Sequence, residues 1–200
     1  MKRRTTSHTG KSAARGRNVR AGRIRIIGGS LRGRYIDVPA GAALRPTPNR
    51  VRETLFNWLQ HDVAGSHCLD LYAGSGALGI EALSRGAAAV TFVEADAGIA
   101  AALRGQLAQL NVTGNVVCRS VEAFLADSSD AFDIIFADPP FADAAEPVCE
   151  AVPARLRADG VFYCERDAAG ELPALSWAPW SRSQQAGDVR FGIARMPADD

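Results

Sequence analysis

Between residues 68 and 166 the chain alternates apolar runs with helical patterns. Runs typical of buried strands lie at 68–72, 89–96, 115–120, 132–138 and 160–166. Helices are expected at 77–85, at 98–110, shortly after residue 120 and, broken near Pro153, before the last of these strands. Such alternation predicts a parallel sheet covered on both faces. The predicted fold class is therefore α/β.

The two ends of the chain depart from this alternation. Residues 180–196 hold two extended stretches around Gly187 and Asp188 with no helix between them, so an antiparallel hairpin should complete a seven-stranded, mostly parallel sheet. Near the N-terminus, 23–27 and 34–38 predict a smaller β-hairpin. A helix should follow, with Thr47 as its N-cap and Pro48 at its first position.

A glycine-rich loop follows the first buried strand. Gly74, Gly76 and Gly79 have the spacing G-x-G-x-x-G between a strand and a helix, and Glu94 ends the next strand 20 residues after Gly74. Glycines let backbone N–H groups approach a ligand, and a carboxylate at that distance can accept both hydroxyls of a ribose. The pattern predicts a nucleoside-containing cofactor, the alternative being a glycine turn needed only for packing.

The length of the chain bears on which cofactor this is. A nicotinamide-dependent dehydrogenase needs a second half-sheet, for which 200 residues with one glycine loop leave no room. S-adenosyl-L-methionine needs only one half, so it is the predicted cofactor. Asp70 can either meet the cationic end of its methionine moiety or bind the loop's own N–H groups. Ala95 and Val121 are candidates to flank the adenine.

The strand 132–138 ends on Asp138, Pro139, Pro140 and Phe141. Two prolines stop a strand and stiffen its exit. An exocyclic amine of a nucleobase is a poor nucleophile, and a carboxylate and a carbonyl that accept its two N–H bonds would direct its lone pair toward a methyl donor. Asp138 and the carbonyl of Pro139 fit these roles, while Phe141 offers a stacking face to an extruded base.

Charge is divided unevenly along the chain. Residues 1–52 hold 14 Lys or Arg and one acid, whereas residues 53–200 hold 9 bases and 21 acids. We predict a disordered basic tail over 1–22, an RNA-docking hairpin extension over 23–46, and a methyltransferase domain over 47–200. A merely solvated basic tail is the alternative. The predicted RNA-binding residues are Arg23, Arg25, Arg32, Arg34, Arg45 and Arg50.

Several segments together resemble one family. RIIGGSLRGR, LRPTPNRVRETLFNWL, LDLYAGSGALGIEALSRGA and DPPF are similar to the ribosomal small-subunit methyltransferase D family, which methylates N2 of a guanine in 16S rRNA. The resemblance runs from Arg25 almost to the C-terminus. It implies a Rossmann-like, seven-stranded class I methyltransferase fold whose last strand is antiparallel, and as target a guanine in a hairpin loop facing the P site.

The resemblance also assigns residues. It implies a cofactor site with a segment at Arg45 to Thr47 closing over the methionine end, and catalysis by the tetrapeptide that begins at Asp138. Ser120 stands where related enzymes often have Asp or Asn for the adenine amine, so Ser120 or a backbone group takes that contact. Together with Ala95 and Val121, which the pattern itself suggests, the predicted cofactor residues are Asp70, Ala73, Gly74, Ser75, Gly76, Glu94, Ser120 and Thr47.

Other functions share part of this pattern. A DNA adenine-N6 methyltransferase would need a target-recognition domain, and a noncatalytic RNA-binding protein would not bind S-adenosyl-L-methionine; a protein-glutamine methyltransferase usually has Asn at the position of Asp138. The four cysteines are isolated, no metal is implied, and no run approaches a membrane span. We expect a cytoplasmic protein, monomeric by default, that acts on 16S rRNA in the small subunit or an assembly intermediate.

Overall fold

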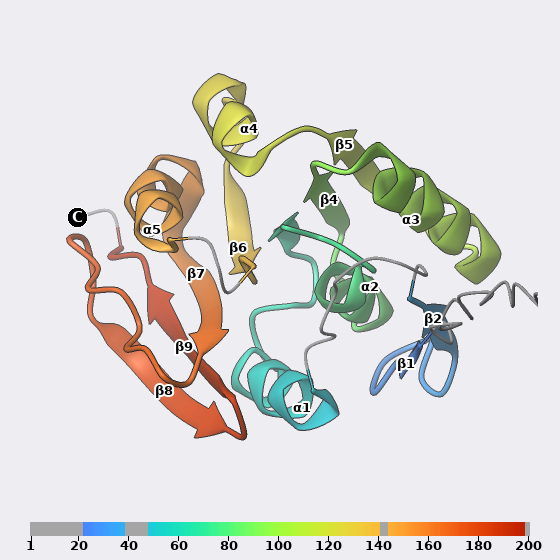
Figure 1. Ribbon diagram of the computed structural model, residues 1–200, viewed down its shortest axis with the longest axis horizontal. Coiled ribbons are helices and arrows are strands. Elements are labelled where there is room, and N and C mark those ends of the chain that lie inside the picture. The colour runs from blue at the N-terminus through green and yellow to red at the C-terminus, as the bar shows by residue number, and fades with distance from the viewer. Residues whose placement is uncertain (1–21, 39–47, 141–143, 199–200) are drawn as a thin grey trace, which may run out of the picture.

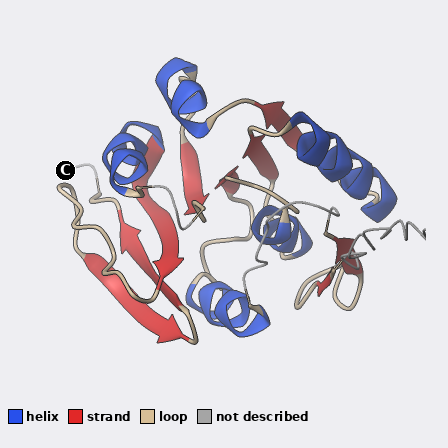
Figure 2. Cartoon of the chain, viewed as in Figure 1, coloured by secondary structure: helices blue, strands red, loops and turns tan. Residues whose placement is uncertain are grey.

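The computed structural model describes residues 22–38, 48–140 and 144–198. They form one large sheet with helices on both faces, and a separate two-stranded sheet beside it (Figures 1 and 2). Among these residues, no helix is long and apolar enough to cross a membrane.

The large sheet has seven strands in the order β5-β4-β3-β6-β7-β9-β8. Its strands are β3 His67–Leu71, β4 Ala89–Glu94, β5 Asn115–Cys118, β6 Phe132–Ala137, β7 Leu156–Asp167, β8 Trp180–Ala186 and β9 Val189–Arg195. The neighbours from β5 to β7 pair in parallel, and β9 pairs antiparallel with both β7 and β8. The predicted seven-stranded sheet, with only its last strand antiparallel, is confirmed.

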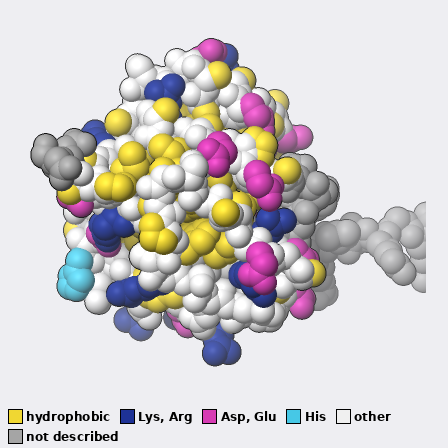
Figure 3. All heavy atoms as spheres, turned by 90° about the vertical axis from the view of Figure 1, so that its left-hand side faces the viewer, with side chains coloured by type: hydrophobic (Ala, Val, Ile, Leu, Met, Phe, Trp, Pro, Cys, Tyr) yellow, Lys and Arg dark blue, Asp and Glu magenta, His cyan; other side chains and the backbone are white. Residues whose placement is uncertain are grey.

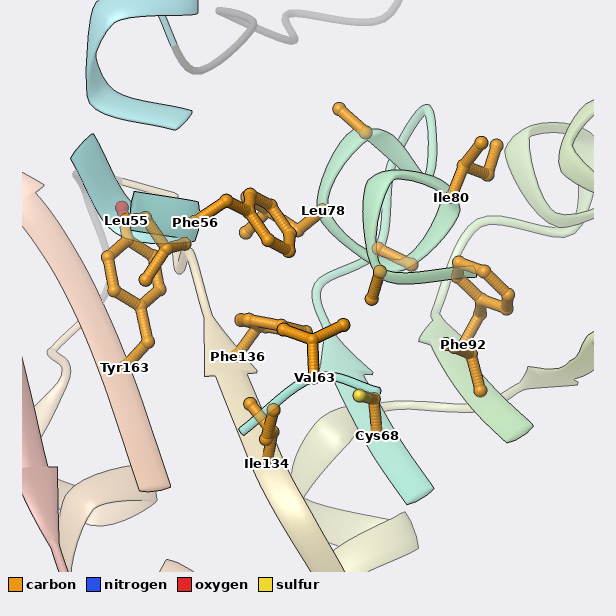
Figure 4. Packing of buried hydrophobic residues seen from close by; sticks show 14 of the residues in the cluster. Leu55, Phe56, Val63, Cys68, Leu78, Ile80, Phe92, Ile134, Phe136 and Tyr163 are labelled. Carbon is orange, nitrogen blue, oxygen red and sulfur yellow. The ribbon is translucent and has the colours of Figure 1, made fainter. Parts of the chain in front are cut away.

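Helices cover the sheet in two groups, α1 to α3 on one face and α4 and α5 on the other (Figure 1). They are α1 Asn49–Trp58, α2 Ala77–Ser84, α3 Ala97–Leu110, α4 Val121–Asp127 and α5 Glu146–Ala151, the last continuing as a 3-10 turn Val152–Arg155. On the first face Leu55, Phe56 and Leu78 come together with Phe136 and Tyr163 of the sheet (Figure 4).

Two boundaries differ from the predictions. Pro48 occupies the N-cap position of α1, one residue before the helix, and makes no side-chain capping hydrogen bond; Thr47, the predicted cap, lies outside the described residues. β7 begins at Leu156 rather than near Gly160, because its pairing with β6 shifts register between Phe132 and Ile134 and so picks up a second stretch of ladder.

The connections of β3 create a crevice at the carboxyl end of the sheet. The chain passes from β3 to β4 and β5 on one side and then returns to β6 on the other. Ligands of open α/β sheets bind at such a switch point, because the two loops there separate. The register Leu71 with Ala137 brings the glycine loop after β3 beside Asp138 after β6.

The small sheet is the predicted N-terminal hairpin, with β1 Arg23–Arg25 and β2 Tyr35–Asp37 antiparallel. Each strand buries its middle residue, Ile24 or Ile36, in the core that also holds α1 to α3. The hairpin therefore packs on the same face of the molecule as these three helices.

Candidate active site

The loop after β3 is a sharp backbone turn. Tyr72, Gly74 and Gly76 have φ of 58°, 53° and 75°, in the left-handed region that few non-glycine residues adopt. The N–H of Ala73 donates to Val93 O at 2.9 Å, and the N–H of Gly76 donates to Ala73 O at 2.7 Å. The loop is thereby fastened to β4 and directs the start of α2 into the crevice.

The second and third glycines also meet a packing requirement. A Cβ on Gly76 would lie 2.5 Å from Leu103 Cδ1, and one on Gly79 would lie 2.3 Å from the Phe92 ring. α2 therefore packs too closely on β4 and α3 to admit a side chain. The packing explanation holds for Gly79, while the backbone conformation accounts for Gly74.

Glu94 ends β4 and faces the glycine loop. One carboxylate oxygen accepts from the N–H of Gly74 at 2.9 Å and the other from the N–H of Asp96 at 2.8 Å. A carboxylate has about four acceptor sites, so two remain for ribose hydroxyls. The half-buried side chain thus fits the predicted cofactor contact, and it also holds the loop.

Asp70, on β3, is buried beneath the same loop. Its Oδ2 accepts from the N–H of Gly79 in α2 at 2.8 Å. Burial raises the pKa of Asp70 to about 8; the Gly79 hydrogen bond opposes this shift, and Glu94 and Glu165 add to it. Of the two roles that the sequence left open, binding an N–H group near the loop is the one the described residues display.

Asp138 follows β6 directly, with Pro139 buried and Pro140 exposed behind it. Across the strand pair lie Tyr163, Cys164 and Glu165 at the end of β7, since Ala137 pairs with Cys164. The Tyr163 hydroxyl donates to Glu165 at 3.0 Å, and burial, then Glu165 and Asp138, raise the pKa of Tyr163. Phe141 lies outside the described residues.

The predicted adenine side lies at the ends of β4 and β5. Ser120 is the N-cap of α4, its hydroxyl oxygen accepting from the N–H of Ala123 at 3.2 Å. Val121 behind it is buried and Ala95 is exposed. Ser120 is therefore engaged as an acceptor, while its hydroxyl hydrogen can still be donated.

The predicted RNA-binding arginines have different surroundings. Arg23, Arg25, Arg32 and Arg50 are exposed. Arg34 is exposed too, but its guanidinium donates to the carbonyls of Leu110 and Gln109 at 2.8 Å each, at the C-terminal end of α3. Cations at a helix C-terminus stabilise the helix, so Arg34 has a structural role that the sequence did not suggest. Arg45 lies outside the described residues.

A buried charge cluster was not foreseen. Arg52 and Glu81 are both 0% exposed and lie 3.3 Å apart. The same carboxylate accepts from Arg85 and from the N–H groups of Ile27 and Gly28, at 2.8 Å each. Burial lowers the pKa of Arg52, and Glu81 opposes that shift. The sequence feature that could have indicated this cluster is Glu81, the one charged residue in the helix sequence ALGIEALS.

Comparison with known proteins shows which family the chain resembles. The family model described as conserved hypothetical protein 95 matches residues 24–195. Ribosomal RNA small subunit methyltransferase D of Escherichia coli is 41% identical over 184 residues, which cover 89% of this chain and 92% of that protein. The putative rRNA methyltransferase YlbH of Bacillus subtilis is 35% identical, over 75% of this chain and 86% of that one.

Solved structures agree. The putative methyltransferase yhhF from Escherichia coli superposes with a TM-score of 0.81 at 40% identity, covering 89% of this chain and all (100%) of that one. The 16S rRNA N2 G1207 methyltransferase of Thermus thermophilus, in complex with AdoMet and guanosine, has a TM-score of 0.66 at 25% identity, over 88% of this chain and 50% of that one.

Proposed function

The chain belongs to the family of conserved hypothetical protein 95 and ribosomal RNA small subunit methyltransferase D, and from this premise we propose that it methylates the exocyclic N2 of a guanine in 16S rRNA. That it is an S-adenosyl-L-methionine-dependent methyltransferase of small-subunit rRNA follows from the family itself. The choice of guanine N2 is supported by the likeness to an N2-guanine methyltransferase with the same fold.

The observation that carries the proposal is the placement of Asp138 at the switch point of the sheet, beside the glycine loop. In the proposed mechanism, the Asp138 carboxylate and the Pro139 carbonyl accept the two N–H bonds of the guanine amine. This localises the nitrogen lone pair, and the stiff Pro139–Pro140 exit holds both acceptors in place at little entropic cost. Phe141 would stack on the extruded base.

The cofactor residues fit the shape of their ligand. The loop Ala73 to Gly76 presents backbone, Glu94 retains acceptor sites for a ribose, and Val121 with Ala95 would flank the adenine. When bound, S-adenosyl-L-methionine supplies a methyl group on a cationic sulfur. The carboxylates of Glu94 and Asp138 make this end of the sheet acidic, which favours such a cation, and Asp70 would add to this charge only when it is ionised.

We assign the docking of RNA to the basic N-terminal part. Exposed Arg23, Arg25 and Arg32 of the hairpin and Arg50 of α1 would bind phosphates, which positions a substrate without reading its bases. Because contacts to phosphates carry no sequence information, selectivity would come from the shape of a folded RNA or ribonucleoprotein. The residues of 1–22 would add diffuse attraction.

The test is to identify the product. The protein is incubated with labelled S-adenosyl-L-methionine and one of three substrates, which are unmodified 16S rRNA, small subunits and duplex DNA. Each product is digested to nucleosides, which are separated and identified by mass spectrometry. N2-methylguanosine from an rRNA substrate is expected. N6-methyladenine from DNA, or cofactor binding without transfer to any substrate, would overturn the proposal.

A further inference from the structure

The outward face of the N-terminal hairpin carries an exposed aromatic ring. Because β1 and β2 bury only their middle residues, Arg23, Arg25, Tyr35 and Asp37 all face solvent. Tyr35 is 44% exposed, and among the residues that the structure describes it is the one large hydrophobic side chain left exposed. A single exposed aromatic needs no explanation by itself. Its surroundings set this one apart.

Tyr35 lies among arginines. The guanidinium of Arg23 lies 4.5 Å from the centroid of the Tyr35 ring, and Arg25 is the register partner of Tyr35 on β1. Arg23 also pairs with Asp37 at 3.4 Å, which offsets the acid on this face. A cation held over the ring fixes its orientation, and the 44% of Tyr35 that stays exposed is open to a planar ligand.

The outward face of the hairpin carries arginines without an acidic partner among the described residues. Within the described part of the chain, neither Arg25 nor Arg32 has a salt-bridge partner. Both are exposed, Arg25 on β1 and Arg32 in the turn that leads to β2. Charge complementarity therefore favours a polyanion as the partner of this surface.

The platform is rigid despite its short strands. The turn is fastened to α2 through Ser84, whose hydroxyl accepts from the N–H of Leu31 at 2.9 Å and whose carbonyl accepts from the N–H of Ser30 at 2.7 Å. Glu81 binds two further N–H groups of the same turn. A ring on such a platform loses little entropy when a ligand stacks on it.

We propose that this face binds an unpaired nucleotide of the substrate RNA, with its base stacked on the exposed part of the Tyr35 ring and its flanking phosphates bound by Arg25 and Arg32. Every base has a π-face, so the contact would recognise an unpaired base rather than a sequence. The inference rests on the proposed function and adds to it a second contact point on the RNA.

The nucleotide on Tyr35 is not the one that is methylated. Arg34, the neighbour of Tyr35, binds carbonyls at the end of α3, whereas α3 begins beside Glu94 at the carboxyl edge of the sheet. A helix of 14 residues is about 20 Å long. A folded RNA that spans this distance would satisfy both contacts, and a free nucleoside would not.

The test measures the affinity of unmodified 16S rRNA and small subunits for Tyr35→Ala, Tyr35→Leu and Tyr35→Phe. Loss of the ring should raise the dissociation constant about 5- to 100-fold in the Ala and Leu variants, while Tyr35→Phe should stay within about twofold of wild type. Leu keeps apolar bulk without a π-face, so it separates stacking from general hydrophobic contact. Unchanged affinity in Tyr35→Ala would overturn the inference.

Charge and partner are tested separately. Arg25→Ala should reduce the slope of log affinity against log salt by about 1, and the control Arg182→Ala, an exposed arginine on β8 at the far edge of the large sheet, should not. A photoreactive substitution, Tyr35→p-benzoylphenylalanine, should crosslink to RNA. Crosslinking only to a ribosomal protein, or a Tyr35→Leu variant that binds as wild type does, would contradict RNA stacking.

Failure of this inference can be told from failure of the proposed function. If the wild-type protein forms N2-methylguanosine in rRNA but the Tyr35 variants bind RNA normally, only the docking assignment is wrong. If the wild-type protein transfers no methyl group to rRNA, the proposed function fails whatever the variants do. Thermal unfolding of each variant excludes misfolding as the cause of weaker binding.

Discussion

The candidate active site and the N-terminal hairpin are held in place by different means. Glu94 ends β4, and Gly74 and Asp138 come after β3 and β6, so the ladder of the seven-stranded sheet itself brings them together. The hairpin has two strands of three residues and depends on side-chain contacts, among them the two hydrogen bonds from its turn to buried Glu81. A sheet with many ladder hydrogen bonds loses little stability when one bond is removed. Removal of a single carboxylate that accepts from four donors breaks several contacts at once.

The surfaces of the two regions differ as well. At the carboxyl edge Glu94 and Asp138 are half-buried carboxylates, and Asp70 and Glu165 are buried near them, whereas the hairpin presents exposed arginines. An acidic site suits a cationic cofactor, and a basic platform suits a polyanionic substrate. Figure 3 shows a third face, toward β8 and α5, where apolar, acidic and basic side chains are intermixed. In the function that we propose, the molecule would thus separate the chemistry from the docking of RNA.

The largest expected effect is on the hairpin's attachment. Glu81→Gln leaves the buried Arg52 charge without its counter-ion, which should lower the free energy of unfolding by about 3–5 kcal/mol, measured by urea denaturation. Amide hydrogens of Ile27 and Gly28 should exchange much faster, while those of β3 and β6 change only with global stability. The control Glu122→Gln, an exposed acid on α4, should cost less than about 1 kcal/mol.

An outcome in which Glu81→Gln unfolds like wild type would mean that the cluster is not what fastens the hairpin. Equal loss of exchange protection in the hairpin and in the central strands would mean that the two regions are not separable. Either result would break the comparison between them.

A smaller effect is expected at the active site. Glu94→Ala should weaken S-adenosyl-L-methionine binding about tenfold or more, because ribose hydroxyls lose a charged acceptor worth about 1.5–3 kcal/mol. Calorimetry measures this directly. Glu94→Gln keeps an oxygen for the N–H of Gly74 and serves as the matched variant: if it binds as weakly as Glu94→Ala, the lost ribose contact is responsible rather than a loosened loop. An unchanged dissociation constant in Glu94→Ala would contradict the assignment.

The smallest expected effect is the change in the free energy of unfolding per pH unit that the titration of Asp70 causes. The folded protein holds a proton on Asp70 up to about pH 8, whereas the unfolded chain loses it near 3.8. The folded state therefore binds more protons between these values, and stability should fall as pH rises from 4 to 8, by at most about 1.4 kcal/mol per pH unit. Asp70→Asn should remove this slope in urea unfolding at pH 5 and pH 8. A slope that is unchanged in the variant would assign it to another group.

The same titration decides between the two roles of Asp70. A cationic methionine end beside Asp70 would favour its ionised form, so wild-type affinity for S-adenosyl-L-methionine should increase toward pH 8 relative to Asp70→Asn. If both proteins show the same pH profile, Asp70 serves only to hold the N–H of Gly79.

Most of the architecture was predictable because it rests on local patterns. The alternation of apolar runs with helical patterns gave five strands of the large sheet, the two extended stretches of 180–196 gave the other two, and the glycine loop and Asp138 were correctly placed at strand ends. The start of β7 was not predictable, since it depends on a register shift against β6. The roles assigned to the site residues stay predictions.

Side-chain contacts between residues far apart in the chain could not be predicted from the sequence. Glu81 binds Ile27, 54 residues away, and Arg52, 29 residues away, and no local pattern reports such a distance. Arg34 was grouped with the RNA-binding arginines on charge alone, although its guanidinium reaches the end of α3, 76 residues along the chain. Position in a motif predicts where a residue lies in the fold, while its partners depend on the tertiary packing.

The central claim is that Asp138 activates the guanine amine at a site assembled by the sheet. The most direct measurement is the single-turnover rate of methyl transfer to rRNA by Asp138→Ala at saturating S-adenosyl-L-methionine and RNA. We expect the rate to fall at least about 100-fold, as on removal of one acceptor or donor from a preorganised site, while the dissociation constant of the cofactor stays within about twofold. A rate within a few fold of wild type would contradict the claim.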